Sequence, residues 1–328
     1  MRVLLAAALA VLLAFPAGAS DFGRAAAGTS GSEFLLFDTS ARGIAMGGAY
    51  TTATNDASSI YWNPAGLSQV PRFSATFLHT QYIADITYNA AAVAKRVNDS
   101  AVLAVGVRYL DYGAITRTDS FSPQSKGEFH PRSYLAELGW GQSIYDLSDS
   151  EVDVTMGVSV KYLHTDLVER GHGYGGDFGV HSRFYGTSQT YDIALAIQNL
   201  GVGQKFDKVR DSLPTRVRFG GGVRPIKPLL LTLEAVAPIN NAPYGAAGME
   251  YSVEIQKNIS GAVRAGFNTM TYDSLGLTSI LNFGFGVKLS DLSFDYAFAP
   301  AGELSGQIHR VSLSYNLPAK ISRRYRER

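Results

Sequence analysis

From residue 72 to residue 318, apolar and polar side chains alternate in about fourteen segments of roughly 9 to 12 residues. The clearest of these segments runs from Asp153 to Leu163. One face of it carries Val154, Met156, Val158, Val160 and Tyr162, and the other carries Asp153, Thr155, Ser159 and Lys161. A period of two is the geometry of a β-strand with one apolar and one polar face. This part of the chain is therefore predicted to form a large antiparallel sheet.

The predicted strands are separated by Gly, Pro, Asn, Asp and Ser, which favour turns. They cover residues 72–82, 86–96, 101–111, 132–143, 153–163, 174–185, 190–199, 214–224, 229–238, 245–255, 260–269, 280–289, 292–298 and 307–317. Soluble sandwiches and lipocalin-like barrels also alternate, but they bury the apolar face, and fourteen such faces would overfill a small soluble barrel. With the apolar faces in lipid, every backbone group must pair within the protein, so the sheet must close. The pattern predicts an all-β fold, a transmembrane antiparallel β-barrel of about 14 strands over residues 72–318.

The first residues predict export. Met1-Arg2 is a short basic head, Val3–Ala14 is apolar, and Ala17-Gly18-Ala19 fits the cleavage rule, so residues 1–19 are predicted to be a signal peptide. An uncleaved signal anchor is the alternative, but an apolar run of about 12 residues is short of the roughly 20 that span a bilayer. The chain has no cysteine, which excludes a lipoprotein anchor and a disulfide framework. We expect a protein of the bacterial outer membrane with both termini in the periplasm, because the strand number is even.

Several classes of function lack support in the sequence. A formal net charge of +1 gives nucleic acid nothing to bind. The six histidines lie on separate segments without metal-ligand spacing, and there is no Gly-x-Ser-x-Gly nucleophile elbow. Residues 171–176 match G-x-G-x-x-G but lack the strand-turn-helix setting of a nucleotide site, so we expect a loop leading into a strand. We expect no catalytic site, no metal site and no cofactor.

Residues 20–71 differ from the barrel in character, since Ala, Gly, Ser and Thr dominate and the alternation is lost. Asn55 or Asp56 could cap a short helix over residues 57–62, which ends at Asn63 because the residue before Pro64 avoids the helical region. Small residues with scattered polar groups suit a hatch, or plug, that fills a polar lumen. We expect Arg42, Asp56 and Asn63 to hydrogen-bond to the inner wall; a disordered periplasmic leader is the alternative.

The inward positions of the predicted strands carry charges of both signs in similar number. They are Arg108, Glu137, Lys161, Asp177, Arg183, Asp192, Arg216, Arg218, Glu234, Glu250, Arg264, Lys288, Asp295 and Arg310. Such charges must pair with one another or contact water, which predicts an ionic network around the hatch. The residues predicted to form it are Arg42, Asp56, Asn63, Pro64, Asp177, Arg216, Arg218, Glu250, Arg264, Asp295 and Arg310. A tunnel for apolar ligands would need an inward apolar cluster, and the strands show none; residues 34–37 and Tyr50 could supply part of one.

Long and short links alternate, as periplasmic turns and extracellular loops do in barrels. The longest candidate outer loops are residues 112–131, 201–213 and 270–279, whereas the link 144–152 is longer than this rule predicts. Tyrosines near the strand ends are explained by an interfacial girdle. Phe121, Phe129 and Phe206 in the outer loops are the candidates for contact with a ligand or cargo. Residues 319–328 form a basic tail, predicted to lie in the periplasm, where anionic headgroups or a partner could bind it.

The order of several motifs resembles the PorV/PorQ family within the FadL-like superfamily of outer-membrane proteins. The most specific motifs are residues 40–49 (SARGIAMGGA), Asn55-Asp56-Ala57 and residues 62–67 (WNPAGL). Weaker motifs follow in the same order at residues 173–180, 198–201, 248–251, 264–267 and 295–298, ahead of His309-Arg310. The resemblance spans nearly the whole mature chain.

The resemblance implies a fourteen-stranded barrel with an N-terminal hatch, and two alternative activities. A PorV-type protein escorts secreted cargo in type IX secretion, whereas a FadL-type protein takes up fatty acids or other hydrophobic small molecules through a gap in the barrel wall. Kinship favours the first activity, but kinship does not fix function. The partners implied are outer-membrane lipid, protein cargo or a hydrophobic ligand, and the barrel assembly machinery during biogenesis.

Overall fold

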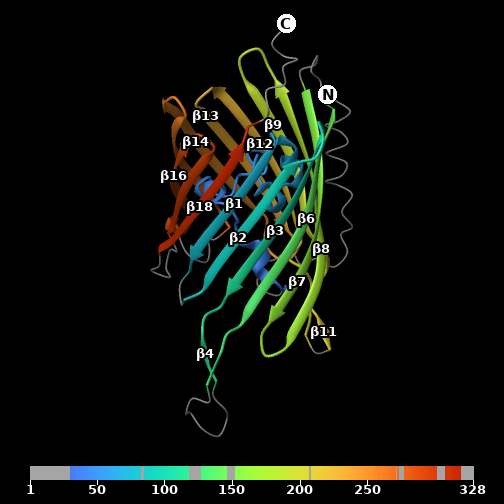
Figure 1. Ribbon diagram of the computed structural model, residues 1–328. Coiled ribbons are helices and arrows are strands. Elements are labelled where there is room, and N and C mark those ends of the chain that lie inside the picture. Colours follow the sequence, from blue (N-terminus) through green and yellow to red (C-terminus); the bar gives the residue numbers. More distant parts are fainter. Residues whose placement is uncertain are drawn as a thin grey trace.

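The fold is a closed antiparallel barrel of fourteen strands (Figure 1). The computed structural model describes residues 30–82, 85–117, 127–145, 152–206, 208–270, 272, 277–300 and 307–318. The barrel strands are β1 (Phe73–Gln81), β2 (Thr87–Arg96), β3 (Ala101–Asp111), β6 (Arg132–Tyr145), β7 (Val152–Asp166), β8 (Arg170–Tyr185), β9 (Thr190–Val202), β12 (Arg216–Ile226), β13 (Leu229–Pro238), β14 (Tyr244–Gln256), β15 (Ile259–Asn268), β16 (Leu281–Leu289), β17 (Leu292–Pro300) and β18 (Gln307–Leu317). Each neighbours the next in chain order, and β1 pairs with β18 to close the ring. The predicted fold class is confirmed.

Two short hairpins in the loops were not predicted. They are β4 (Ile115–Thr116) with β5 (Glu128–Phe129), and β10 (Lys205–Phe206) with β11 (Val209–Arg210). Both lie at the end of the barrel that carries the links 112–131, 203–215 and 269–280, the lower end in Figure 1. We call this the long-loop end. The opposite, short-turn end carries tight links such as 227–228 and 290–291, the first residue of β1 and the last residue of β18.

The two faces of the wall differ as the alternation predicts. On β7, Val158 and Val160 point outward with exposed fractions of 48% and 61%, whereas the alternate residues Ser159 and Lys161 are each 4% exposed. Large apolar residues are exposed in this way on every barrel strand. A soluble protein does not expose a continuous apolar surface of this extent, so the exterior is the lipid-facing surface of a transmembrane barrel.

Cross-strand register marks the limit of the apolar exterior near the long-loop end. One outward row consists of directly paired His79, Asn89, Tyr109, Tyr134, His164 and His172. The next row toward the long-loop end is polar and consists of Gln81, Thr87, Asp111, Arg132, Asp166 and Arg170. A row of tyrosine and histidine side chains next to a polar row is typical of the membrane-water interface, where we expected the tyrosines to lie.

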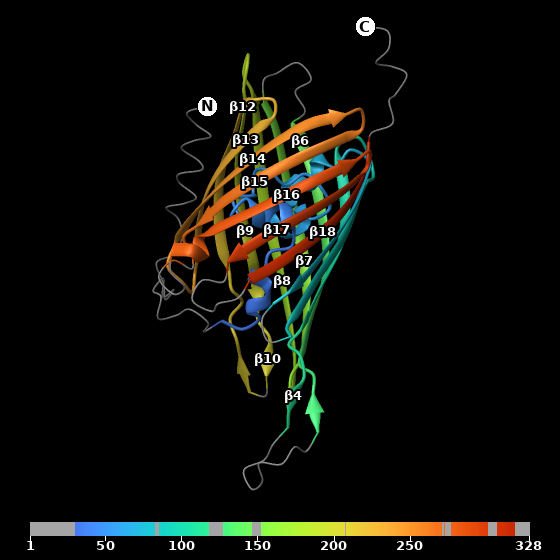
Figure 2. The same ribbon diagram turned by 90° about the vertical axis from the view of Figure 1, so that its left-hand side faces the viewer.

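Residues 30–70, which we call the N-terminal segment, lie inside the ring of strands (Figure 2). The segment contains η2 (Glu33–Leu36), α2 (Ala41–Ala45), α3 (Ser59–Trp62) and η3 (Pro64–Gln69). Gly31 N donates to Ser212 O at the long-loop end, and Arg96 Nε donates to Val70 O at the short-turn end. The segment therefore runs the length of the lumen. None of the helices within the described ranges is long and apolar enough to cross a membrane.

The local structure of the segment follows from short polar side chains. Ser40 Oγ accepts from Gly43 N and caps α2. Asn63 ends α3 and begins η3, with its Oδ1 accepting from Ala65 N, as expected before Pro64. The predicted cap at Asn55 or Asp56 is wrong: the helix begins at Ser59, because Asp56 Oδ1 accepts from Ser58 N and Ser58 Oγ and forms a turn ahead of it.

Two further expectations need comment. Residues 171–176 lie within β8 rather than in a loop, since their glycines pair regularly with β7. The predicted signal peptide, the basic tail and Phe121 lie outside the described residues.

Candidate functional site

Glycines on the inner face of the wall bring the N-terminal segment into direct backbone contact. A Cβ atom at Gly266 would lie 1.9 Å from Gly47 N, and one at Gly157 would lie 2.2 Å from the carbonyl carbon of Pro64. A Cβ atom at Gly248 would likewise meet the backbone, at Met46 O, whereas Cβ atoms at Gly106, Gly139, Gly179 and Gly284 would meet side chains of the segment. We call these seven residues the glycine track. Because none of them has a side chain, the segment packs against the wall with no intervening layer.

An ionic chain joins the segment to three wall strands. Arg42 of α2 donates from Nε and Nη2 to both carboxylate oxygens of Glu250, at 2.7 and 2.8 Å. Glu250 also accepts from Arg264 Nε at 2.6 Å, and Arg264 Nη1 donates to Asp295 at 2.8 Å. The fork of Arg42 matches the carboxylate, which makes this the strongest class of polar contact between segment and wall. Four of the predicted network residues therefore form one connected unit.

A second wall pair holds the turn that follows α2. Arg218 bonds Glu234 through Nε and donates from Nη2 to Gly48 O at 2.6 Å. The other oxygen of Glu234 accepts from Thr51 N at 3.0 Å. Gly47 and Gly48 have φ of +67° and +79°, a conformation that L side chains rarely adopt. The glycine pair in the motif at residues 40–49 thus allows a turn that these two wall residues hold by its backbone.

Asn63 contacts both the segment and the wall. Its Nδ2 donates to Thr51 O and to Val180 O, each at 3.3 Å, while its Oδ1 occupies the space over Gly179. On the adjoining strand β9, Gln198 Nε2 donates to Tyr61 O and Trp62 O at 2.7 and 2.8 Å. The motif at residues 62–67 is therefore held through its backbone carbonyls and Asn63, and Pro64 lies against Gly157.

A third ionic group belongs to the wall. Lys161 Nζ donates to Asp177 at 2.7 Å and to Asn199 at 2.8 Å, and Glu137 lies between Lys161 and Arg108 at 3.9 and 3.6 Å. Asp177 is thus placed in a network, as predicted, but its partners are wall residues. Arg108 alone reaches the segment, donating to Leu35 O at 3.1 Å.

The remaining predicted network residues are placed differently. Asp56 makes no hydrogen bond to the wall among the described residues; it bonds Ser58, and burial raises the pKa of its carboxyl above the ordinary value. Arg216 donates to Gln198, and Arg310 lies over the ring of Tyr82. Neither arginine has a carboxylate within ion-pair distance in the described part of the chain, so the described residues do not place them in an ionic network.

The candidate contacts in the outer loops lie in the short hairpins. Phe129 is in β5 and Phe206 is in β10, both half-buried. The ring of Phe206 covers Gly171 on β8, where an added Cβ would lie 2.6 Å from it. That side chain therefore packs against the wall, and it offers a ligand only its remaining exposed edge.

An inward apolar cluster at the long-loop end was missed. Its wall members are Leu78, Tyr88, Leu110, Leu135 and Leu163, each at most 2% exposed, and Phe34 and Leu35 of the segment pack in the same cluster. Phe37 lies beside it, with its ring centroid 5.0 Å from that of Tyr82. The sequence did contain a signal for it, because Leu163 lies two residues after Lys161 and four after Ser159, and therefore on the same inward face of the strand. The expectation that the strands carry no such cluster is wrong.

No group of three His, Asp or Glu side chains within the described ranges is arranged to hold a metal ion. His164 and His172 do face each other across β7 and β8, with 3.3 Å between their Nδ1 atoms, but on the outer face of the wall.

Comparison with solved structures identifies the class of fold. The toluene transporter TbuX of Ralstonia pickettii shares 10% sequence identity, with a TM-score of 0.56 over 87% of this chain and 100% of that one. The toluene transporter TodX of Pseudomonas putida shares 10% identity with a TM-score of 0.54 over 85% and 98%. A FadL homologue of Pseudomonas aeruginosa shares 10% identity, with a TM-score of 0.50 over 85% of this chain and 98% of that one. The chain therefore has the fold of FadL/TodX-type barrels. Neither a family model nor a curated protein matches it.

Proposed function

We propose that this chain is an outer-membrane channel for hydrophobic small molecules, closed by its N-terminal segment acting as a hatch. The observation that carries the proposal is the inward apolar cluster at the long-loop end. Its five wall residues offer a site of low polarity at one mouth of the lumen, and the segment's Phe34 and Leu35 fill it, with Phe37 edge-on against Tyr88. An apolar molecule entering from this end would replace these side chains of the segment. Pockets lined mainly by apolar groups are typical of small-molecule sites.

The orientation belongs to the same proposal. Barrels of this class place long loops outside the cell and short turns in the periplasm. With that orientation, the apolar cluster faces the exterior and the ends of β1 and β18 face the periplasm. The ionic chain and the glycine track lie further along the segment, where they would keep the hatch in place until a ligand weakens its outer part.

The cargo-escort activity suggested by the resemblance to PorV/PorQ is not retained as the main proposal. The compared structures are two toluene transporters and a FadL homologue, which favours the uptake alternative. In addition, the motifs that carry the resemblance contact the wall through Arg42, the Gly47–Gly48 turn and Asn63. Sharing them indicates a shared architecture and leaves the activity open.

Uptake measurements test the proposal. In a host strain that lacks its own channel for such compounds, we expect the chain to increase entry of radiolabelled long-chain fatty acid or toluene over the empty vector. Leu163→Thr places a hydroxyl in the apolar cluster and should lower this rate. The matched control is Thr165→Val, the next inward position of β7, which should leave the rate equal or higher.

Uptake equal to the empty vector with correctly folded protein in the membrane would refute the channel proposal. Loss of surface-attached proteins from a deletion strain of the native host, with uptake of hydrophobic compounds unchanged, would favour the escort activity instead.

A further inference from the structure

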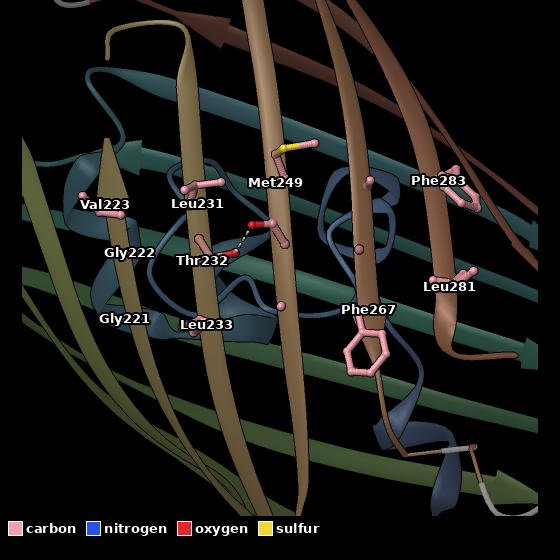
Figure 3. A pocket seen from close by; sticks show the side chains of 14 residues that line it. Gly221, Gly222, Val223, Leu231, Thr232, Leu233, Met249, Phe267, Leu281 and Phe283 are labelled. Atoms are coloured by element: carbon pink, nitrogen blue, oxygen red, sulfur yellow. Dashed lines mark hydrogen bonds between the residues drawn. The ribbon is translucent and has the colours of Figure 1, made fainter. Parts of the chain in front are cut away.

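A groove of about 650 Å³ lies on the outer face of the wall across β12 to β16 (Figure 3). The inward apolar cluster belongs to other strands, β1, β2, β3, β6 and β7. Register places the outward residues of the groove in two neighbouring cross-strand rows. One row is Gly221, Leu233, Ala247, Phe267 and Leu281, and the other is Val223, Leu231, Met249, Ala265 and Phe283. The rows contain the small residues Gly221, Ala247 and Ala265. Figure 3 shows large apolar side chains of the groove, among them Leu231, Met249 and Phe283.

The chemistry of the groove selects an apolar occupant. No charged residue lines it, and its one polar side chain, Thr232, points to the lumen and bonds Gly248 O at 3.4 Å. The groove is continuous with the lipid-facing surface, because the next outward residues toward the short-turn end, Tyr251, Val263 and Phe285, are 43%, 60% and 45% exposed. Within a bilayer, an acyl chain is the molecule that reaches such a surface.

We propose that the groove binds an acyl chain of a membrane lipid at a defined position. The site depends on the transmembrane fold and does not require the proposed channel activity. Three small outward residues, Gly221, Ala247 and Ala265, lie among large ones on five adjacent strands, and they leave the acyl chain a space that a wall of uniformly large side chains would not provide. Dispersion contacts along such a space are individually small and add along the chain.

The groove lies directly behind part of the hatch contact. Gly248 and Gly266 are the inward neighbours of Ala247 and Ala265, and they belong to the glycine track. Cβ atoms there would lie 2.7 Å from Met46 O and 1.9 Å from Gly47 N. One layer of backbone therefore separates the bound acyl chain from the turn of the N-terminal segment. Occupation of the groove stiffens this part of the wall and, through it, the turn at Met46–Gly48.

The test uses wild-type protein, Ala247→Phe and the control Ala136→Phe in nanodiscs of dioleoyl phosphatidylcholine. Ala136 is an exposed outward residue of β6, so its variant adds the same side chain to the lipid-facing surface outside the groove. In native mass spectrometry, wild-type protein and Ala136→Phe should retain a lipid adduct. Ala247→Phe should retain about tenfold less, a loss equal to the contact of about two methylene groups.

Hydrogen exchange supplies a second readout. Residues 44–49 should exchange more slowly in nanodiscs than in a short-chain detergent for wild-type protein and Ala136→Phe, and this difference should vanish for Ala247→Phe. Equal lipid retention by all three folded proteins would overturn the proposal. A dimer of wild-type protein that Ala247→Phe abolishes would also overturn it, since the occupant would then be a second copy of the chain.

Discussion

The glycine track makes Gly266→Ala a sharp test of how the N-terminal segment is held. The added Cβ would lie 1.9 Å from Gly47 N and 2.2 Å from the carbonyl carbon of Met46. Ordinary contact begins at about 3.4 Å, so the turn must retreat by about 1.5 Å (3.4 − 1.9), and both obstacles are backbone atoms. Overpacking of this kind costs about 1 to 3 kcal/mol. The population with the turn detached should therefore rise by about 5- to 150-fold.

Hydrogen exchange of residues 43–50 in lipid nanodiscs measures that population. Exchange should accelerate by a factor within this range in Gly266→Ala, while the amides of β14 and β15 stay protected. Gly245→Ala is the matched control on β14, because its Cβ would have only one neighbour, at 4.0 Å. Unchanged exchange in Gly266→Ala, or equal acceleration in both variants, would refute the claim that close backbone packing holds the segment.

Three further predictions follow from the contacts. Glu250→Gln leaves Arg42 and Arg264 with a neutral partner. Breaking a fully buried ion pair costs at least about 3 kcal/mol, and because Arg42 is partly exposed, the segment should lose up to about that much stability. Hydrogen exchange of residues 41–50 measures the loss, and unchanged exchange would contradict the ionic chain. Gln198→Ala removes two hydrogen bonds to the carbonyls of Tyr61 and Trp62 and should lower stability by about 1 to 3 kcal/mol, seen as a lower melting temperature, whereas an unchanged value would make these bonds dispensable. Leu233→Arg should lower the free energy of unfolding, measured by urea titration in vesicles, by about 2 to 4 kcal/mol, because the charge would lie in the middle of the bilayer. Val253→Arg, nearer the short turns, should lower it by only about 0 to 1 kcal/mol. Equal losses would be inconsistent with a bilayer around β13 and β14.

The strands could be predicted because each carries its own signal. Period-two alternation is local, so the segments 101–111 and 229–238 coincide with β3 and β13 without knowledge of any partner strand. The hairpins β4–β5 and β10–β11 have strands of two residues, too short for a period to be visible. Helix α3 ends where Asn63-Pro64 predicts, but it starts later than expected because Asp56 bonds Ser58 locally.

Pairing across the lumen could not be predicted. Arg42 and Glu250 are 208 residues apart, and their meeting depends on the path of the segment and on the register of fourteen strands. Inward positions of the charges could therefore be predicted from the strands, while the expected bond of Asp56 to the wall is replaced by local bonds to Ser58. The glycines of the track were visible as inward small residues, but their sequence does not say which backbone they accommodate.

The apolar cluster shows a different limit. Leu110, Leu135 and Leu163 occupy inward parity beside Arg108, Glu137 and Lys161, so the strands did hold the information. The cluster was overlooked because the inner face of one strand runs along the lumen from a polar region to an apolar one. Describing each strand face as either polar or apolar hides this change. Reading each inward row across neighbouring strands, rather than along one strand, would have found it.

Cysteine scanning of β7 tests the central claim, a lipid-facing exterior around a filled lumen. The chain has no native cysteine, so single cysteines at positions 158 to 163 can each carry a nitroxide label in vesicles. Labels at 158, 160 and 162 should be accessible to oxygen dissolved in the bilayer, whereas those at 159, 161 and 163 should be inaccessible to both oxygen and a water-soluble nickel chelate. The opposite alternation, or water-accessible labels at 158, 160 and 162, would contradict the account.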